Sequence, residues 1–169
     1  MLIDIGQITT DSPEATERVA SALSSLLRPG DLLVLDGPLG SGKTTFVRGL
    51  GKALGCSGIS SPSFVLVKEY EGTHKLRHVD LFRIDESSAL DGLGLEELSD
   101  PSRITVVEWA EPAIPLADEG YLEVAFRYGE TANLRTIEFR SVGNLFESRV
   151  RDIREMLERF QERASTPGI

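Results

Sequence analysis

Apolar residues recur along this chain with two periods, and each period predicts a different kind of element. A period near two, or a short continuous apolar run, predicts strands at 2–8, 32–35, 64–70, 75–81, 104–107, 121–128 and 134–140. A period near 3.6 predicts helices that begin near Ser12 and that cover 45–54 and 144–163. Strands that alternate with helices in this way are typical of an α/β domain.

Two pairs of predicted strands lie too close together in the sequence for a helix to connect them. The first pair is joined by the short segment 71–74, and the second pair is joined near Gly129. Both pairs are therefore expected to form antiparallel hairpins. Because antiparallel strands often lie beside parallel ones, we expect a mixed sheet.

The last predicted helix is amphipathic and carries both acids and bases. Its apolar residues recur at helical spacing on one side, and they are Val150, Ile153, Leu157 and Phe160. Two interpretations stay open from the sequence. The segment is either a surface helix packed on the sheet or a helix that binds a partner through this apolar side.

A glycine-rich motif lies between the first core-like strand and the next helix. Residues 37–44 read GPLGSGKT and fit G-x-x-x-x-G-K-[ST], the phosphate-binding P-loop. The apolar run 32–35 precedes the motif and the predicted helix 45–54 follows it, which is the context that the motif needs. Backbone N–H groups and the positive end of the helix dipole would bind phosphate there, and the glycines would let the backbone approach it.

The sequence therefore predicts an α/β fold of P-loop NTPase type, in which a mixed sheet is flanked by helices and carries antiparallel hairpins and a C-terminal helix. We expect residues 1–143 to form a P-loop ATPase domain. Residues 144–169 would add the amphipathic helix and a tail, either within the same domain or as an appendage. A length of 169 residues suits this organisation.

Composition and charge narrow the possible partners and the compartment. The net charge of −9 argues against a broad basic face for nucleic acid. No apolar run approaches the length that spans a membrane, and the N-terminus lacks the pattern of a signal peptide. Cys56 is the single cysteine, so it cannot form an internal disulfide. These features favour a cytoplasmic protein with no membrane partner.

Polar side chains near the P-loop are candidates for binding and hydrolysing a nucleotide. Lys43 would contact the outer phosphates, and Thr44 would offer its hydroxyl to Mg²⁺, which commonly joins phosphates to one or two protein ligands. Glu108 follows the strand 104–107, and Asp80 ends another extended run. Because ligands bind at the carboxyl ends of parallel strands, either acid could bind the metal or orient the attacking water.

Three further features have two interpretations each. The segment Ser61-Pro62-Ser63 could sense a γ-phosphate, or it could be a plain turn before a strand. His78 is more often a packed or hydrogen-bonded histidine than a catalytic one. Trp109 beside Glu108 is either part of the core or an exposed contact for a partner.

Four segments in a fixed order resemble one known family. The P-loop is followed by Ser-Pro-Ser-Phe at 61–64, by His-Val-Asp-Leu-Phe-Arg at 78–83 and by Val-Glu-Trp at 107–109. This set resembles the bacterial TsaE (YjeE) family of small P-loop ATPases. The resemblance implies a protein that binds ATP with Mg²⁺ and hydrolyses it slowly. It also implies a requirement for the protein in threonylcarbamoyladenosine (t6A) modification of tRNA.

The resemblance also implies partners and site residues. The family acts with TsaD and TsaB, which transfer the threonylcarbamoyl group, so tRNA would be met only through that complex. Lys43, Asp80 and Glu108 carry over as catalytic residues, and the metal contacts are Thr44 and the same two acids. The ATP-binding residues that carry over are Thr9, Asp11, Leu39, Gly40, Ser41, Gly42, Lys43, Thr44, Thr45, Ser63, Trp109 and Arg135.

This chain departs from the family pattern at three points. Ser63 stands where the family usually has Thr, which keeps a hydroxyl, and Phe82 stands where it usually has Tyr, which removes a phenol. The Gly-Arg pair that the family shows near 133–135 is not intact. That last departure affects the expected base-binding residues Thr9, Asp11 and Arg135 more than it affects the phosphate site.

Three other functions stay open. A small-molecule or nucleotide kinase could use the same P-loop, although the sequence shows no arginine-dense insertion for a lid. A GTPase is disfavoured because the Asn-Lys-x-Asp signature is absent. A module that binds a nucleotide without hydrolysing it would look similar to a slow ATPase. No arginine finger is evident in the sequence, so we expect hydrolysis to be slow until partners complete the site.

Overall fold

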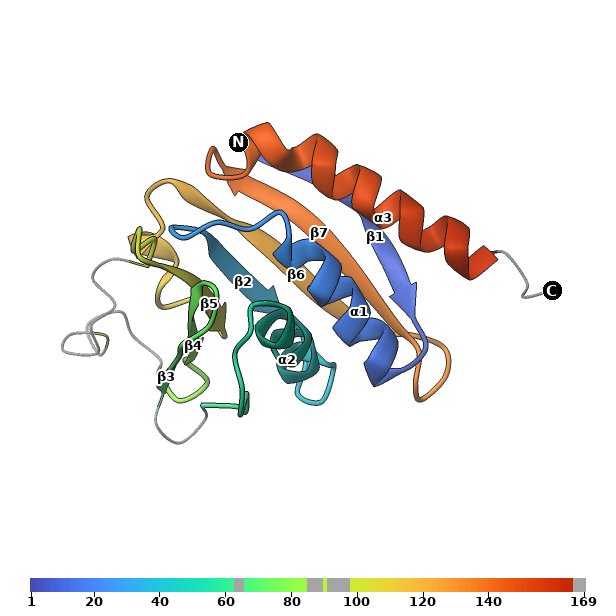
Figure 1. Cartoon of the computed structure of the whole chain (residues 1–169), viewed down its shortest axis with the longest axis horizontal. Coiled ribbons are helices and arrows are strands. Elements are labelled where there is room, and N and C mark those ends of the chain that lie inside the picture. The colour runs from blue at the N-terminus through green and yellow to red at the C-terminus, as the bar shows by residue number, and fades with distance from the viewer. Residues whose placement is uncertain (63–65, 85–89, 91–97, 166–169) are drawn as a thin grey trace.

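The computed structural model of the chain describes residues 1–62, 66–84, 90 and 98–165. The strands in this part are β1 (Leu2–Thr10), β2 (Leu32–Asp36), β3 (Val67–Tyr70), β4 (Lys75–Asp80), β5 (Arg103–Glu108), β6 (Gly120–Tyr128) and β7 (Arg135–Gly143). The α-helices are α1 (Pro13–Ser24), α2 (Lys43–Ala53) and α3 (Val150–Ser165). The strands form one sheet, and α3 lies along β1 at the opposite end of the molecule from β3 (Figure 1).

The sheet is mixed, as the sequence predicts. Its strand order is β1-β7-β6-β2-β5-β4-β3. The central strand β2 is parallel to both β5 and β6, and β4 is parallel to β5. The two predicted hairpins are present as the antiparallel pairs β3–β4 and β6–β7, and β1 pairs with β7 as an edge strand. The carboxyl ends of β2, β4 and β5 therefore meet at one edge of the sheet, as in other parallel sheets that bind ligands.

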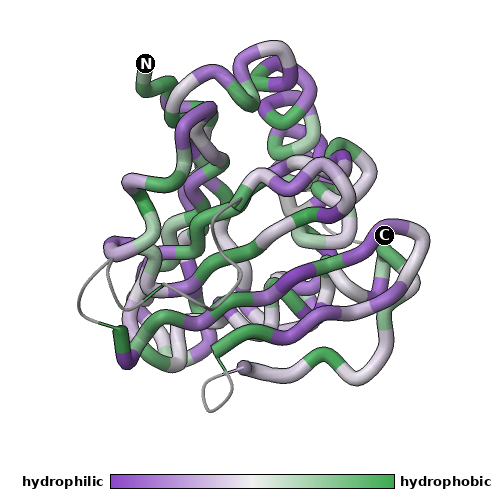
Figure 2. The backbone as a smooth tube through the Cα atoms, turned by 90° about the vertical axis from the view of Figure 1, so that its left-hand side faces the viewer, coloured by the Kyte–Doolittle hydropathy of each residue, from purple (hydrophilic) through white to green (hydrophobic). Residues whose placement is uncertain are grey.

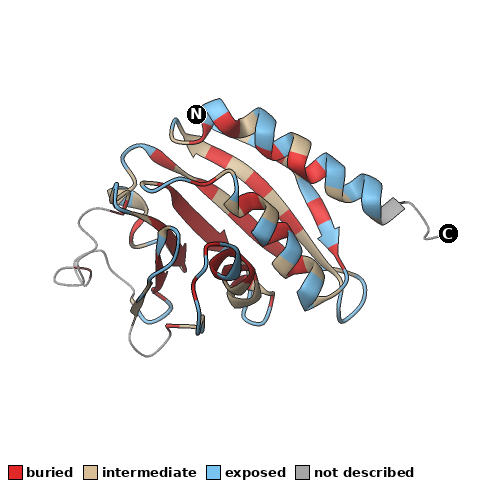
Figure 3. Cartoon of the chain, viewed as in Figure 1, coloured by how far each residue is buried: buried red, intermediate tan, exposed pale blue. Residues whose placement is uncertain are grey.

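The larger core lies between the sheet and the helices. Buried side chains of α1, α2 and α3 meet strand residues there, among them Leu23, Phe46, Phe139 and Leu157. A smaller core on the opposite face includes Val107. Figure 3 shows β2 buried along most of its length, whereas burial alternates along β6 and β7. The alternation along β6 and β7 reflects strands with one face toward the core and the other less covered. Figure 2 shows hydrophilic and hydrophobic residues interspersed along the backbone.

The helix that follows β1 starts where the sequence predicts. The Ser12 hydroxyl accepts a hydrogen bond from the backbone N–H of Ala15 at 3.2 Å and so caps α1. Pro13 occupies the first helical position, where its missing N–H costs nothing. The predicted helix at 45–54 is also present, and it begins two residues earlier, at Lys43.

The predicted start of the last helix is wrong. The pattern predicts a helix from residue 144, whereas α3 begins at Val150 after a short 3₁₀ turn, Glu147–Arg149. The backbone N–H groups of Asn144 and Leu145 both donate to the carbonyl oxygen of Glu119, so they are already satisfied outside a helix. Phe146 is fully buried in the larger core. Tertiary contacts therefore keep residues 144–146 out of the helix, and the spacing of apolar residues in the sequence does not show such contacts.

The apolar side of α3 faces the rest of the protein. Ile153 and Leu157 are buried, and Val150 and Phe160 pack against the same core while partly exposed. The helix lies against β1 and reaches α1. The structure therefore favours the surface-helix interpretation for this apolar side. No helix within the described residues has the length and apolar character to cross a membrane.

Candidate nucleotide-binding site

The P-loop leads from the buried central strand β2 into α2. Gly37 is its first residue and has a φ of +140°, which favours glycine. A Cβ atom placed there would lie 2.8 Å from the carbonyl oxygen of Phe126 on β6. The start of the P-loop is therefore packed against β6, and a side chain at position 37 would push the loop away from that strand.

The side chain of Lys43 folds back onto the start of the P-loop. Its ammonium donates to the carbonyl oxygens of Gly37 at 2.6 Å and Pro38 at 3.1 Å. It also lies 4.8 Å from the centre of the Trp109 ring. Burial lowers the pKa of Lys43, while the nearby carboxylates, Glu108 first among them, oppose that shift. The side chain is thus a buried cation held at the place where a phosphate would bind.

Asp80 and Glu108 lie side by side at the carboxyl ends of two parallel strands. They end β4 and β5 and are direct partners in the register of that pair. Side chains alternate along a strand, so both acids share the sheet face of Leu76 and Val106, which belong to the core beneath α2. Both are buried. The sheet therefore delivers two carboxylates to the side of the P-loop helix.

Each carboxylate is held by a hydrogen bond. Asp80 accepts from the backbone N–H of Phe82 at 3.0 Å. Glu108 is 2.8 Å from Nε2 of His78, which is fully buried. The structure thus gives His78 the hydrogen-bonded position that the sequence favours over a catalytic one. Because its ring contacts Glu108, it fixes the direction of that carboxylate.

One cavity of about 230 Å³ collects most of the predicted site residues. Its lining is Leu39, Gly40, Gly42, Lys43, Thr44, Thr45, Ser61, Asp80, Phe82, Glu108 and Trp109. The hydroxyl of Thr44 and the two carboxylates are hard oxygen donors, which suits Mg²⁺. No group of three or more His, Cys, Asp or Glu side chains suited to a metal occurs among the described residues.

The expected base-binding residues line two different cavities. Arg135 lies at a second, smaller cavity of about 110 Å³, which it shares with Ser41 of the P-loop. Thr9 and Asp11 instead line a cavity between β1, α1 and α3. Thr10, which lies between Thr9 and Asp11 in the sequence, is the direct register partner of Arg135 on β7. Ser63 lies outside the described residues.

Two features of the site were missed from the sequence. Tyr128 donates from its hydroxyl to the carbonyl oxygen of Leu39, and its ring lies 4.7 Å from the guanidinium of Arg135. Trp109 has a φ of +56°, which is uncommon for a residue other than glycine, and its ring lies 5.0 Å from that of Phe82. The one feature of the sequence that could have pointed to Tyr128 is its position next to the predicted turn at Gly129, across which it faces Arg135.

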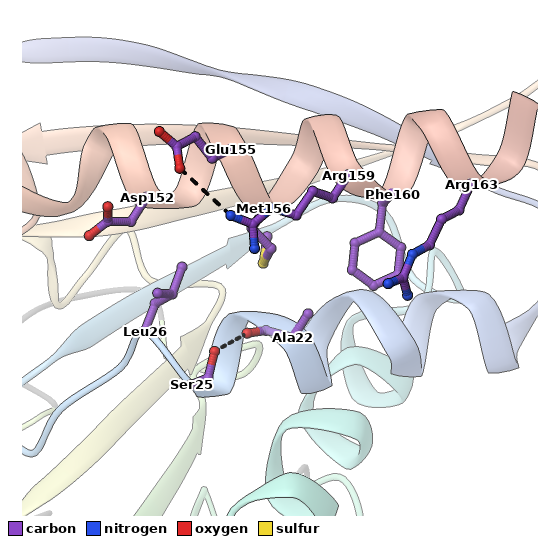
Figure 4. Close-up of a pocket in the computed structure, with 9 residues that line it drawn as sticks. All are labelled: Ala22, Ser25, Leu26, Asp152, Glu155, Met156, Arg159, Phe160 and Arg163. Carbon is purple, nitrogen blue, oxygen red and sulfur yellow. Dashed lines mark hydrogen bonds and ion pairs between the residues drawn. The ribbon is translucent and has the colours of Figure 1, made fainter.

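A separate cavity of about 390 Å³ lies between α1 and α3 (Figure 4). Met156 and Phe160 point from α3 toward α1, and the opposite wall is formed by Ala22 of α1 and by Leu26 just after that helix. The charged side chains at its rim include Arg159, which pairs with Glu155 on the same helix. None of its lining residues belongs to the cavity at the P-loop.

The sequence matches one family model, described as threonylcarbamoyl adenosine biosynthesis protein TsaE, over residues 10–137. The tRNA threonylcarbamoyladenosine biosynthesis protein TsaE of Bacillus subtilis (strain 168) is 37% identical over 141 residues, which cover 82% of this chain and 87% of that protein. The protein of the same name from Nostoc sp. is 37% identical over 123 residues, which cover 69% of this chain and 75% of that protein.

The fold has a solved counterpart. The crystal structure of Bacillus subtilis YdiB matches with a TM-score of 0.72 and 31% sequence identity, and the match covers 95% of this chain and 98% of that chain. The sequence match and the structural match therefore point to the same family. The chain belongs to the TsaE family, whose proteins are involved in t6A biosynthesis for tRNA.

Proposed function

We propose that this protein is a slow, Mg²⁺-dependent ATPase that serves t6A modification of tRNA by acting on a complex of TsaD and TsaB. The carrying observation is that Lys43 and Thr44 share one cavity with the adjacent acids Asp80 and Glu108. A P-loop alone would suit any phosphate ligand, whereas a P-loop beside two strand-end carboxylates suits a nucleotide with its metal.

Each side chain has a role that follows from its position. The loop N–H groups and Lys43 would bind the phosphates of ATP, and the carbonyl contacts of Lys43 would give way to them. Thr44, with Asp80 or Glu108, would hold Mg²⁺, which neutralises phosphate charge when bound. The remaining acid would orient the attacking water. In these roles His78 would orient Glu108, and the backbone N–H of Phe82 would orient Asp80.

The lining of the cavity supports the proposal that hydrolysis is slow. No arginine side chain among the described residues lines it. Phosphoryl transfer gains a large factor from an arginine that stabilises the developing charge. We therefore propose that the partner proteins supply or trigger a missing group, and that the isolated chain turns over slowly.

The remaining contacts are proposed at a coarser level. Leu39, Gly40, Ser41, Gly42 and Thr45 would hold the nucleotide through the P-loop backbone. Trp109 would flank the phosphates, since its ring lies beside Lys43. Ser63, Thr9, Asp11 and Arg135 stay as proposed contacts from the family resemblance. With a net charge of −9, tRNA would be met only through the partner complex, in the cytoplasm.

Binding and hydrolysis can be separated with two variants. Lys43→Ala is expected to weaken MgATP binding by about 10- to 100-fold, because charge-assisted hydrogen bonds to phosphate are lost. Glu108→Gln is expected to keep binding within about threefold but to lower partner-stimulated hydrolysis by about 100-fold or more. Calorimetric titration measures the first effect, and phosphate release measures the second.

Lys52→Ala is the matched control for the first variant. Lys52 lies on the same helix, is largely exposed and pairs with Glu17 of α1. The control should bind ATP as the wild-type protein does. Wild-type affinity in Lys43→Ala would contradict the site, and transfer of phosphate from bound ATP to a small molecule rather than to water would favour a kinase instead.

A further inference from the structure

The carbonyl groups of the P-loop are held by side chains. The oxygens of five consecutive residues, 37–41, accept hydrogen bonds from three side chains. Lys43 donates to the first two oxygens, Tyr128 to the third and Arg135 to the last two. A loop that binds phosphate through its N–H groups needs its carbonyl groups to point elsewhere. These contacts therefore fix the orientation of the peptide groups that anion binding requires.

Tyr128 and Arg135 reach the loop from the β6–β7 hairpin. Tyr128 ends β6, Arg135 begins β7, and the two are direct partners across the antiparallel pair. Arg135 donates through Nε to the Ser41 oxygen at 3.2 Å and through a terminal nitrogen to the Gly40 oxygen at 3.5 Å. Its guanidinium lies over the Tyr128 ring, so each side chain supports the other.

Arg135 is also anchored to its own hairpin. Its other terminal nitrogen donates to the carbonyl oxygens of Ala132 and Leu134, both at 2.8 Å. One guanidinium therefore ties the hairpin to the P-loop. That arrangement needs several donors in a fixed planar fork, which arginine has and lysine lacks.

We propose that Tyr128 and Arg135 are positioning residues that hold the P-loop in its phosphate-binding shape before a nucleotide arrives. The inference rests on the proposed function, because it takes a nucleotide as the ligand. A loop that is ordered in advance loses less conformational freedom on binding, so these loop contacts raise affinity in addition to any contact that Arg135 itself makes with the nucleotide. Lys43 differs from them, because its own loop contacts give way when it turns to the phosphates.

Two conservative variants separate loop holding from direct contact with the ligand. Tyr128→Phe removes one hydroxyl and keeps the ring beneath the guanidinium. Arg135→Lys keeps the charge and loses the fork. The matched controls are Tyr121→Phe, near the opposite end of β6, and Arg140→Lys, whose side chain pairs with acids on β6 and β7.

The first readout is amide hydrogen exchange at residues 37–44 in the nucleotide-free protein, followed by mass spectrometry. The second is the Kd for ADP in the presence of Mg²⁺. We expect both variants to exchange faster in this segment and to bind ADP about 3- to 10-fold more weakly, as the loss of one or two hydrogen bonds predicts. The two controls should match the wild-type protein in both readouts.

Unchanged exchange at 37–44 in both variants would overturn the inference. That holds even if Arg135→Lys bound ADP more weakly, because such a pattern would make Arg135 a ligand contact. A wild-type protein that bound no nucleotide would contradict the proposed function instead. In that case the exchange experiment would still decide whether the two side chains hold the loop.

Discussion

Trp109 is the one tryptophan in the sequence, and it lies against the P-loop lysine. Its ring contacts the Lys43 ammonium on one side and the Phe82 ring on another. Indole emission depends on nearby charge and on exposure to water. The position of the Lys43 ammonium should therefore be visible in the fluorescence of the protein.

Nucleotide binding is expected to change the emission of Trp109. MgADP would draw the Lys43 ammonium from the Gly37 and Pro38 oxygens to the phosphates, which alters the charge beside the indole ring. A fluorescence titration should give a saturable change in the wild-type protein and in Lys52→Ala. The change should be lost in Lys43→Ala, and an identical response in that variant would contradict the assigned position of the lysine.

At the residue scale, the sequence predicts the site residues whose position is set by a local motif or by the end of a strand. Lys43 follows from the P-loop motif, and Asp80 and Glu108 follow from their positions at strand ends. Tyr128 could not be predicted in the same way. Its partner Leu39 lies 89 residues earlier, and the contact depends on how the hairpin is placed beside the loop.

The two helices α1 and α2 lie very close together at Gly49. A Cβ atom added to Gly49 would lie 2.4 Å from the carbonyl oxygen of Glu17 and 2.6 Å from its Cα atom. Both are backbone atoms of α1, so they cannot move aside as a side-chain tip would. Glycine within a helix usually costs about 1 kcal/mol relative to alanine, and here the close packing outweighs that cost.

Gly49→Ala is expected to destabilise the protein by about 1–3 kcal/mol, because overpacking pushes α1 away from α2 despite the gain in helix propensity. Gly51→Ala is the control in the same helix, since its added Cβ would come within 3 Å only of side-chain atoms, Cδ1 and Cγ1 of Ile59, and of no backbone atom of another element. Urea denaturation of both variants gives the comparison. A Gly49→Ala protein at least as stable as the wild type would contradict the packing.

At the element scale, hydrophobic spacing predicts the kind of each element better than its ends. The short connections at 71–74 and near Gly129 predict both hairpins, because a helix does not fit there. The start of α3 was predicted six residues too early. Phe146 and the N–H bonds from 144–145 to Glu119 hold that connection through tertiary contacts, which have no period in the sequence.

A buried ion pair joins the C-terminal segment to the rest of the molecule. Arg149, just before α3, makes two hydrogen bonds to Asp31, the residue before β2, at 2.5 and 2.6 Å. It also donates to the carbonyl oxygens of Leu26 and Leu145. Both charged residues are buried. We propose that residues 144–169 belong to the same cooperative unit as 1–143 and are not an appendage.

Arg149→Ala is expected to destabilise the whole protein by about 3–5 kcal/mol, because Asp31 would stay buried without its partner. Arg151→Ala is the control, since that arginine is exposed and its pair with Glu155 is worth about 0.5 kcal/mol or less. Thermal or urea unfolding followed by circular dichroism and by Trp109 fluorescence should give one transition. Separate transitions for the two probes, or an unchanged midpoint in Arg149→Ala, would contradict a single unit.

At the scale of the whole molecule, the order of motifs carries more information than any one of them. The P-loop predicts phosphate binding in many proteins. Together with the segments 61–64, 78–83 and 107–109 it resembles one family, and the comparisons confirm that family. The packing of all three helices into one core could not be predicted from the sequence. The apolar side of a helix shows that the helix is packed, but it does not show which face of the sheet the helix covers.

The most direct measurement is Mg²⁺-dependent ATP hydrolysis by the purified chain, with and without TsaD and TsaB. The account predicts slow release of phosphate by the chain alone, a clear increase when both partners are added, and loss of that increase in Lys43→Ala. A chain that hydrolysed ATP equally fast alone and in the complex would contradict partner dependence. A partner-stimulated rate that survived Lys43→Ala would contradict the site itself.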